Sequence, residues 1–278
     1  MRQRVITGFI FTVLVLSFFV PALWWPVTGV AMAVIIGVVA CVEMYKAIRN
    51  GGYHPSRLLL IIGMCLATLI VICGLIFKLN VESIMALYLI VVCMYCVSCG
   101  INLPLVRPED DKAFLNGMFT GGMIFYISFP LFCFVSALLF VPNGWYYMVI
   151  GLFAPWGTDT FAYAVGRRFG KHKLTSVSPK KSIEGSIGGT IGSVVVALIF
   201  TYIIKNNIDI DLSYMLVGIT TCILSIFSQI GDLAASSIKR EMDVKDYGNL
   251  LPGHGGMLDR IDSLIFIAPF AYFLFILL

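Results

Sequence analysis

Leu58–Phe77 has the sequence LLLIIGMCLATLIVICGLIF, twenty consecutive residues without a charged side chain. A helix of this length rises about 30 Å, which matches the hydrocarbon core of a bilayer. The rest of the chain is similar in character: of its 278 residues 59% are hydrophobic and 12% are charged, and its mean hydropathy is +0.96. Soluble domains are far less apolar. We therefore expect an all-α, polytopic integral membrane protein.

Nine apolar runs of this kind predict nine transmembrane helices, because about 20 apolar residues are needed to cross a bilayer as a helix. The first run resembles a secretory signal, but no small-residue cleavage site follows it, so we expect a retained span. We expect one integral membrane domain, with an amino-terminal helical scaffold in residues 1–140 and two large polar connections in residues 141–278. The runs are Ile6–Trp24, Val27–Ala47, Leu58–Phe77, Ile84–Leu105, Gly117–Phe140, Trp145–Val165, Ile187–Ile204, Leu212–Ile230 and Ser263–Leu278.

The net charge of +4 does not indicate a nucleic-acid partner, because the basic residues lie in short connections and form no long run. Lipid head groups and phosphorylated substrates are the partners that we expect. If the amino terminus is cytoplasmic, 17 of the 19 Lys and Arg residues lie on the inside, and only Lys78 and Lys205 lie outside. The positive-inside rule then predicts an outer carboxyl terminus and cytoplasmic polar connections, in a bacterial inner membrane or its equivalent.

The eight cysteines lie in or at the edges of apolar runs, which is typical of small buried hydrophobic residues rather than of a disulfide framework. Cys93, Cys96 and Cys99 would share one helix face. A thiolate metal site is the alternative there, but no histidine or acidic residue accompanies them, so we favour packing.

Ser236–Asp262, SSIKREMDVKDYGNLLPGHGGMLDRID, concentrates ionisable groups beside the eighth apolar run. If the eighth helix continues, Asp232, Ser236 and the following basic pair lie three or four residues apart on adjoining faces. The glycines that follow allow a close approach of the backbone to a phosphate. The side chains suited to holding phosphates are Lys239, Arg240, Lys245, His254 and Arg260.

Carboxylates in and beside the same segment predict a cation site, because the ends of two different helices supply them. Mg²⁺ suits the arrangement, since it takes one or two carboxylates and completes its octahedron with water and phosphates. The alternative is that the charges only snorkel at a helix end, but acidic residues near the bilayer edge are costly. The carboxylates are those of Asp232, Asp246, Asp259 and Asp262.

The connection after the sixth run, residues 157–189, predicts a second polar wall. It leads into the amino terminus of the seventh helix, which is itself an anion site that neighbouring lysines reinforce. Binding to an anionic lipid surface alone is the alternative, and the presence of the first polar cluster makes it weaker. The polar residues of this wall are Asp159, Arg167, Lys171, Lys180, Lys181 and Ser182.

Both segments resemble the phosphatidate cytidylyltransferases, also called CDP-diacylglycerol synthases. Residues 159–189 are similar to one conserved stretch of that family, and the first four or five spans match only as hydrophobic segments. The main signature is matched, at every spacing, by Ser236, Ile238-Lys239-Arg240, Lys245-Asp246, Gly248, Leu251-Pro252, His254-Gly255-Gly256, Asp259-Arg260 and Asp262.

The resemblance implies that CTP and phosphatidic acid give CDP-diacylglycerol and pyrophosphate, with Mg²⁺ required. The attacking phosphate is already an anion, so positioning and charge neutralisation would carry the catalysis. It also implies a metal centre at Asp232 and Asp259, with one of the weaker candidates serving a second cation. The weaker candidates are Asp159, Asp246 and Asp262.

The resemblance further assigns the phosphate contacts. Lys239, Arg240, Lys245, His254 and Arg260 would hold the CTP phosphates and the leaving pyrophosphate, beside Ser236. Lys180, Lys181 and Ser182 would bind nucleotide or lipid phosphate, and Arg167 and Lys171 the lipid head group. Membrane lipids would enter a cleft between the sixth to ninth helices, and a homodimer through the amino-terminal spans is implied by the resemblance only.

Three other functions fit parts of this pattern. A cytidylyltransferase for another lipid phosphate, such as an archaeal ether lipid, would share the signature. A transporter would place its charges near the midplane and show inverted repeats, neither of which is visible. A non-catalytic protein that binds anionic lipid would need the basic residues but not Asp259.

Overall fold

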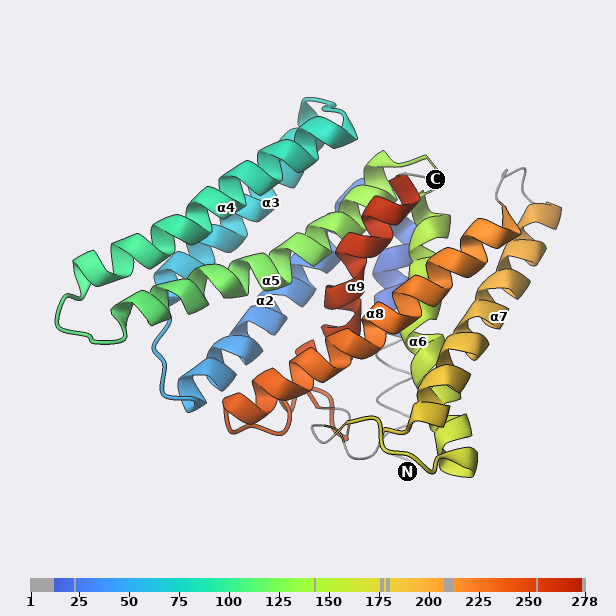
Figure 1. Cartoon of the computed structure of the whole chain (residues 1–278). Helices are drawn as coiled ribbons and strands as arrows, with labels where there is room; N and C mark the ends of the chain where they lie inside the picture. The colour runs from blue at the N-terminus through green and yellow to red at the C-terminus, as the bar shows by residue number, and fades with distance from the viewer. Residues whose placement is uncertain are drawn as a thin grey trace. The chain divides into compact units, whose positions relative to one another are not determined.

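The computed structural model describes residues 13–22, 24–142, 144–175, 178, 181–207, 213–253 and 255–276. Within these residues every regular element is a helix, and only two isolated β-bridges occur. The prediction of an all-α protein is confirmed. The helices are Val13–Ala22, α2 (Pro26–Asn50), α3 (Arg57–Ile76), α4 (Val81–Val106), α5 (Ala113–Phe140), α6 (Gly144–Phe169), α7 (Ile183–Asn207), α8 (Tyr214–Glu241) and α9 (Leu258–Ile276) (Figure 1).

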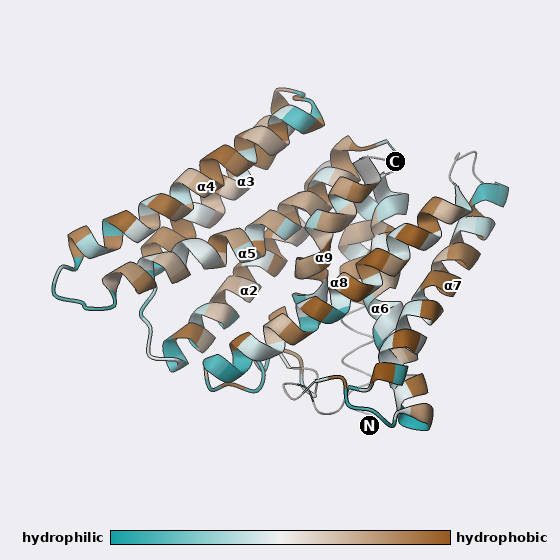
Figure 2. Cartoon of the chain, viewed as in Figure 1, coloured by the Kyte–Doolittle hydropathy of each residue, from teal (hydrophilic) through white to brown (hydrophobic). Residues whose placement is uncertain are grey.

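Six of these helices, α2, α3, α4, α5, α7 and α8, are long and apolar enough to cross a membrane. Figure 2 shows apolar residues along their length and polar residues gathered at helix ends and in connections. The protein is therefore an integral membrane protein, as predicted. The predicted sixth and ninth spans are helical as α6 and α9, but both carry charged groups, and the predicted first span lies partly outside the described residues.

Helix α8 runs well past the end of its apolar run at Ile230 and stops at Glu241. The predicted continuation is thus confirmed, and Asp232, Ser236, Lys239 and Arg240 all lie on this helix. The basic pair lies in its last turn, where positive charge complements the negative end of the helix dipole.

The chain packs into two compact units, here called the first and the second unit. The first consists of Met1–Pro142 and Lys239–Ile261, and the second of Asn143–Ile238 and Asp262–Leu278. The first unit therefore combines the amino-terminal helices with the glycine-rich segment that follows α8. In it α5 is the central helix and packs against α2, α3 and α4.

Small residues allow α4 and α5 to pack closely in the first unit. Gly117 and Gly121 of α5 face the backbone of Cys99 and Cys96 of α4. The Cys96 thiol donates to the Gly121 carbonyl over 3.1 Å, and Cys99 is buried. These two cysteines serve in helix packing, as the sequence indicated.

In the second unit α6 and α7 lie along each other (Figure 1). A Cβ at Gly189 of α7 would lie 2.7 Å from the Thr158 carbonyl oxygen of α6, so the two backbones are too close for a larger residue. Aromatic stacking joins the other two helices of the unit, since the rings of Phe227 on α8 and Phe270 on α9 are 4.3 Å apart.

Gly121 and Gly122 are neighbours on α5 and form a matched pair for a test of this packing. A Cβ at Gly121 would lie 2.8 Å from the Cys96 Cα, whereas nothing lies within 4 Å of one at Gly122. We expect Gly121→Ala to lower the free energy of unfolding by roughly 1–3 kcal/mol through overpacking. Gly122→Ala should leave it unchanged or raise it by up to about 1 kcal/mol. Thermal unfolding in detergent measures both, and equal Tm values would contradict the close contact of α4 and α5.

Candidate functional site

Asp259, in the first turn of α9, organises the segment that follows α8. Its Oδ1 accepts a hydrogen bond from the Lys239 ammonium at 2.9 Å. Its Oδ2 accepts two more, from the backbone N–H groups of Tyr247 at 2.8 Å and Gly256 at 2.9 Å. The carboxylate is buried, so these three donors replace the water that an exposed carboxylate would bind.

The glycine-rich turn closes over this carboxylate. The Leu251 N–H donates to the Gly255 carbonyl at 2.9 Å, and Gly253 and Gly255 have φ values of +79° and +85°. A Cβ at Gly255 would also lie 3.0 Å from the Asp259 Oδ2. Glycine is thus required at Gly255 both by backbone conformation and by space. His254, a predicted phosphate contact in this turn, lies outside the described residues.

A second buried carboxylate, Glu43 of α2, binds the same segment. Its two oxygens accept hydrogen bonds from the Met257 N–H at 2.9 Å and the Leu258 N–H at 2.8 Å. These groups lie where α9 begins, so a side chain more than two hundred residues away caps that helix end. A Cβ at Gly248 or Gly256 would collide with the Glu43 carboxylate.

Glu43 was absent from the residues predicted from sequence, although a signal for it existed. It is the acidic residue inside the second predicted span, Val27–Ala47, and ionisable residues within apolar spans are costly enough to indicate a function. Its partners are backbone groups, which no side-chain pattern reveals. It acts as a positioning residue, because it holds the segment that carries Asp259.

In the second unit, the connection between α6 and α7 meets α8 through an ion pair between Lys181 and Asp232. Both side chains are 27% exposed, so the pair is accessible from outside the unit. The sequence predicted Lys181 as a phosphate contact and Asp232 as a metal ligand, and the structure brings the two together. Lys180 lies outside the described residues.

Glu184, in the first turn of α7, shapes this connection. Its carboxylate accepts from the Lys171 N–H at 3.1 Å, and its Oε1 lies 2.6 Å from the His172 Nδ1. Ser182 accepts from the Gly185 N–H at 3.1 Å and so caps the helix. The side chain of Lys171 is exposed, and the structure assigns its backbone, not its ammonium, to this turn.

A cavity of about 370 Å³ lies between the connection and the helices of the second unit. Four residues of the predicted second polar wall line it together: Asp159 and Arg167 from α6, and Lys181 and Ser182 from the connection. Arg167 is oriented by Tyr163, whose hydroxyl lies 3.4 Å from its Nη1. The cavity therefore combines cationic, anionic and hydroxyl groups within one unit.

A chain of polar side chains joins the helices beside this cavity. Ser186 donates to the Gln229 carbonyl oxygen, and the Gln229 amide donates to the Thr190 hydroxyl at 3.2 Å. Ser225 contacts Thr190 at 3.0 Å and Thr158 at 2.6 Å. Ser186, Gln229 and Thr158 also line the cavity. Such connected networks fix side-chain positions, and all of its members except Ser186 lie in apolar runs, so the sequence did not predict it.

The remaining predicted residues differ in their exposure. Asp262 is buried and accepts from the Ser263 N–H at 2.8 Å. Ser236 is half-buried on α8. Four predicted residues are exposed to solvent: Arg240, Lys245, Asp246 and Arg260.

Asp232 and Asp259 belong to different units, so their convergence on one cation stays a prediction. Among the described residues, no three His, Cys, Asp or Glu side chains are grouped to hold a metal ion. Each of the two carboxylates is instead paired with a lysine of its own unit, Asp232 with Lys181 and Asp259 with Lys239.

Comparison with known proteins identifies the family. The profile of the cytidylyltransferase family matches residues 2–278. The chain belongs to this family. Proteins named phosphatidate cytidylyltransferase are among its relatives. That of Staphylococcus haemolyticus (strain JCSC1435) is 40% identical over 165 residues, which is 59% of this chain and 61% of the relative.

Two further relatives carry the same name. The Bacillus subtilis (strain 168) protein is 48% identical over 120 residues, 43% of each chain. The Staphylococcus aureus (strain COL) protein is 39% identical over 165 residues, 59% of this chain and 61% of the relative. The matched part thus spans less than two thirds of each of these relatives.

Replacing Glu43 tests its role as the anchor of the glycine-rich segment. Glu43→Ala leaves two buried N–H groups without an acceptor, which costs roughly 2–4 kcal/mol of unfolding free energy. We expect faster hydrogen exchange at Met257 and Leu258, with a smaller effect for Glu43→Gln, which keeps one acceptor oxygen. Hydrogen-exchange mass spectrometry of the full chain measures this. Glu82→Ala, at an exposed acid in α4, is the control, and unchanged exchange in Glu43→Ala would refute the anchor.

Proposed function

We propose that this protein transfers the CMP group of CTP to phosphatidic acid. A phosphate oxygen of phosphatidic acid attacks the α-phosphorus of CTP. The bond from that phosphorus to the oxygen bridging the β-phosphorus breaks, and pyrophosphate leaves with the electron pair. The products are CDP-diacylglycerol and pyrophosphate, and no enzyme nucleophile is needed because the attacking phosphate is already an anion.

One observation carries the proposal beyond family membership: Asp159, Arg167, Lys181 and Ser182 line a single cavity. Its volume of about 370 Å³ falls within the range of roughly 300–1,000 Å³ that is typical of small-molecule sites. Cations and a hydroxyl suit phosphate oxygens, and a carboxylate suits a cation that accompanies them. The names of the relatives agree with this chemistry.

The chain's own contribution is charge placement. Lys181 and Lys239 each neutralise an aspartate in the structure. A phosphate group bound beside either pair would offer the lysine of that pair a new anionic partner, so that the lysine neutralises phosphate charge. The carboxylate that it releases would be free to accept another cation. Glu43 and Glu184 keep the two segments in place while these partners exchange.

The carboxylates differ in how well they fit Mg²⁺. Asp232 is partly exposed and paired with a single lysine, so it keeps acceptor capacity for a cation. Asp259 already accepts three hydrogen bonds, and a cation would take the place of the Lys239 ammonium. We therefore propose Asp232, with Asp159, as the better-suited holders in the second unit. Bound Mg²⁺ would supply charge neutralisation at the reacting phosphates.

We further infer that both polar segments face the cytoplasm. The positive-inside distribution of 17 against 2 basic residues supports this orientation. CTP is a cytosolic nucleotide, whereas the acyl chains of the lipid substrate stay in the bilayer. A site at the cytoplasmic helix ends would be reached by both.

The first test is conversion of radiolabelled CTP to a chloroform-soluble product by the purified full-length protein with phosphatidic acid and Mg²⁺. We expect product that depends on lipid and is abolished by a chelator. Asp232→Asn should lower kcat by at least about 100-fold, in line with the loss of a charge that stabilises a transition state.

Asp111→Asn, at an exposed carboxylate between α4 and α5, is the matched control and should keep full activity. If product forms only from an isoprenoid-ether phosphate, that lipid, and not phosphatidic acid, is the substrate. If folded protein forms no product from any lipid phosphate, the transfer reaction is refuted. The non-catalytic lipid-binding function is then favoured.

Lys181 gives a second test, directed at the nucleotide. Lys181→Met removes a charge-assisted contact to phosphate, and such contacts contribute about 1.5–3 kcal/mol. We expect the KM for CTP to rise roughly 10- to 100-fold. Lys173→Met, at an exposed lysine of the same connection, should change it less than about threefold. Equal KM values in the two variants would argue against a phosphate contact at Lys181.

A further inference from the structure

The largest cavity described in the first unit lies away from the glycine-rich segment, between α2 and α3. Both helices pack on α5, and the cavity between them, which is open to the outside, has a volume of about 730 Å³. The walls are apolar along most of the cavity, with Val38 and Val42 from α2 and Leu60, Ile61 and Met64 from α3. None of the residues assigned to the transfer reaction lines it.

One end of this cavity is cationic. Lys46 and Arg49 from the end of α2 and Arg57 from the start of α3 line it. Tyr45 holds the two arginines: its hydroxyl accepts from the Arg57 Nε at 2.9 Å, and both guanidinium groups lie within 5.9 Å of its ring centre. Among the described residues, none of the three cations forms an ion pair with a carboxylate. The cluster therefore has the charge to receive an anion.

The nearest acid on α2 does not neutralise the cluster. Glu43 is buried, and its carboxylate is bound to the Met257 and Leu258 backbone. It lies on a different face of the helix from Arg49, since six residues at about 100° each place the two side chains roughly 120° apart. Helix α2 thus presents one face to the glycine-rich segment and another to the cavity.

The length of the cavity matches one leaflet of a bilayer. Arg49 lies eleven residues after Val38, which is about 16 Å along an α-helix. Half of the hydrocarbon core is about 15 Å thick. Charge at one end and apolar walls over the next 15 Å or so reproduce the polarity profile of a single phospholipid.

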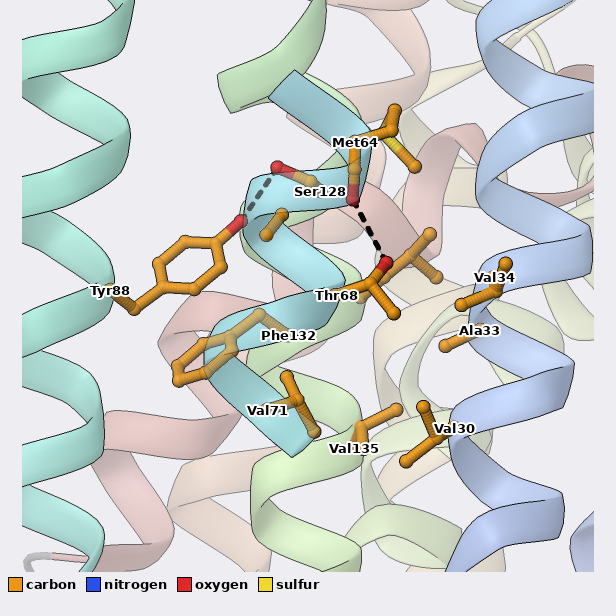
Figure 3. Close-up of a pocket in the computed structure, with 12 residues that line it drawn as sticks. Val30, Ala33, Val34, Met64, Thr68, Val71, Tyr88, Ser128, Phe132 and Val135 are labelled. Atoms are coloured by element: carbon orange, nitrogen blue, oxygen red, sulfur yellow. Dashed lines mark hydrogen bonds between the residues drawn. The ribbon is translucent and has the colours of Figure 1, made fainter. Parts of the chain in front are cut away.

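Met64, at the apolar end, also lines a separate, narrower pocket of about 40 Å³ (Figure 3). Val30, Val71 and Val135 surround it, and the polar groups in its wall are satisfied internally. The Thr68 hydroxyl donates to the Met64 carbonyl at 2.9 Å, and the Tyr88 and Ser128 hydroxyls are 2.6 Å apart. The narrower pocket therefore offers hydrocarbon contacts, and the hydroxyl groups named here already have hydrogen-bond partners.

We propose that the cavity between α2 and α3 binds an anionic diacyl phospholipid of the bilayer. Its phosphate would lie among Lys46, Arg49 and Arg57, and an acyl chain would follow Val38, Ile61 and Met64. Arginine pairs well with phosphate oxygens, and basic pockets between transmembrane helices favour anionic head groups. The cationic head group of a zwitterionic lipid would meet a cluster of like charge. This lipid site is distinct from the proposed transfer reaction and does not depend on it.

The test uses the full-length protein in nanodiscs that contain equal amounts of phosphatidylglycerol and phosphatidylcholine with identical acyl chains. Native mass spectrometry counts the lipids that stay bound on release. We expect wild-type protein to retain phosphatidylglycerol at least about tenfold over phosphatidylcholine. Each basic residue contributes a factor of about five, so Arg49→Gln/Arg57→Gln should lower this preference roughly 25-fold and bring it to parity or below.

Matched variants separate charge from shape. Arg107→Gln/Lys112→Gln removes two charges from an exposed connection of the same unit and should keep the preference. Ile61→Trp, at an exposed position in the apolar wall, should expel the lipid without any change in charge. Lys181→Gln, in the proposed substrate site, should keep the preference for phosphatidylglycerol. The test of the lipid site is therefore independent of the test of the transfer reaction. Free glycerol phosphate should not displace the lipid, because it lacks the acyl chains.

Three results would overturn the proposal. One is equal retention of the two lipids by wild-type protein, which would make the cavity a general site for hydrocarbon. Another is an equal loss of preference in the Arg107/Lys112 control. The third is a Cys65–Cys65 crosslink between two chains that excludes lipid, because it would assign this face to a second copy of the protein.

Discussion

A carboxylate buried among apolar helices has to be supplied with hydrogen-bond donors, and in this protein that requirement shapes the glycine-rich segment. Glu43 takes its donors from the backbone where α9 begins, and Asp259 takes two from the backbone of the turn around it and one from the Lys239 ammonium at the end of α8. Each contact satisfies a costly buried charge and at the same time fixes a piece of irregular backbone. The conformation of the segment follows from these two acids.

The two lysine–aspartate pairs have different surroundings, which gives the aspartates different roles. Asp259 is enclosed and shares its oxygens with backbone groups, so moving it would disturb the turn. Asp232 has a single lysine and partial access to solvent. A charge held by one flexible side chain can change partners with little cost to the fold, whereas one held by backbone cannot. The surroundings of each aspartate, more than its residue type, therefore suit Asp259 to holding the turn in place and Asp232 to holding a cation.

Much of the architecture could be predicted from sequence because it depends on local patterns. Apolar runs of bilayer length predicted the helices, and the continuation of α8 beyond Ile230 followed from helical spacing. Arg167, Lys181 and Ser182, which the sequence placed in one polar wall, line one cavity, and their roles as lipid head-group and phosphate contacts stay predictions. What local pattern could not show is pairing between distant segments. Glu43 binds backbone groups 214 and 215 positions away, and backbone donors are the same at every residue.

That separation along the chain bears on biosynthesis. Helix α2 is made first, whereas Met257 and Leu258 are added only after more than two hundred further residues. Until then the Glu43 carboxylate lacks its donors, so the nascent amino-terminal helices carry an unsatisfied acid in the membrane. Synthesis of Met257 and Leu258 supplies the missing donors. A ribosome that stops before Met257 thus leaves a chain with an unsatisfied carboxylate in α2, which gives membrane quality control a physical means of recognising such a chain.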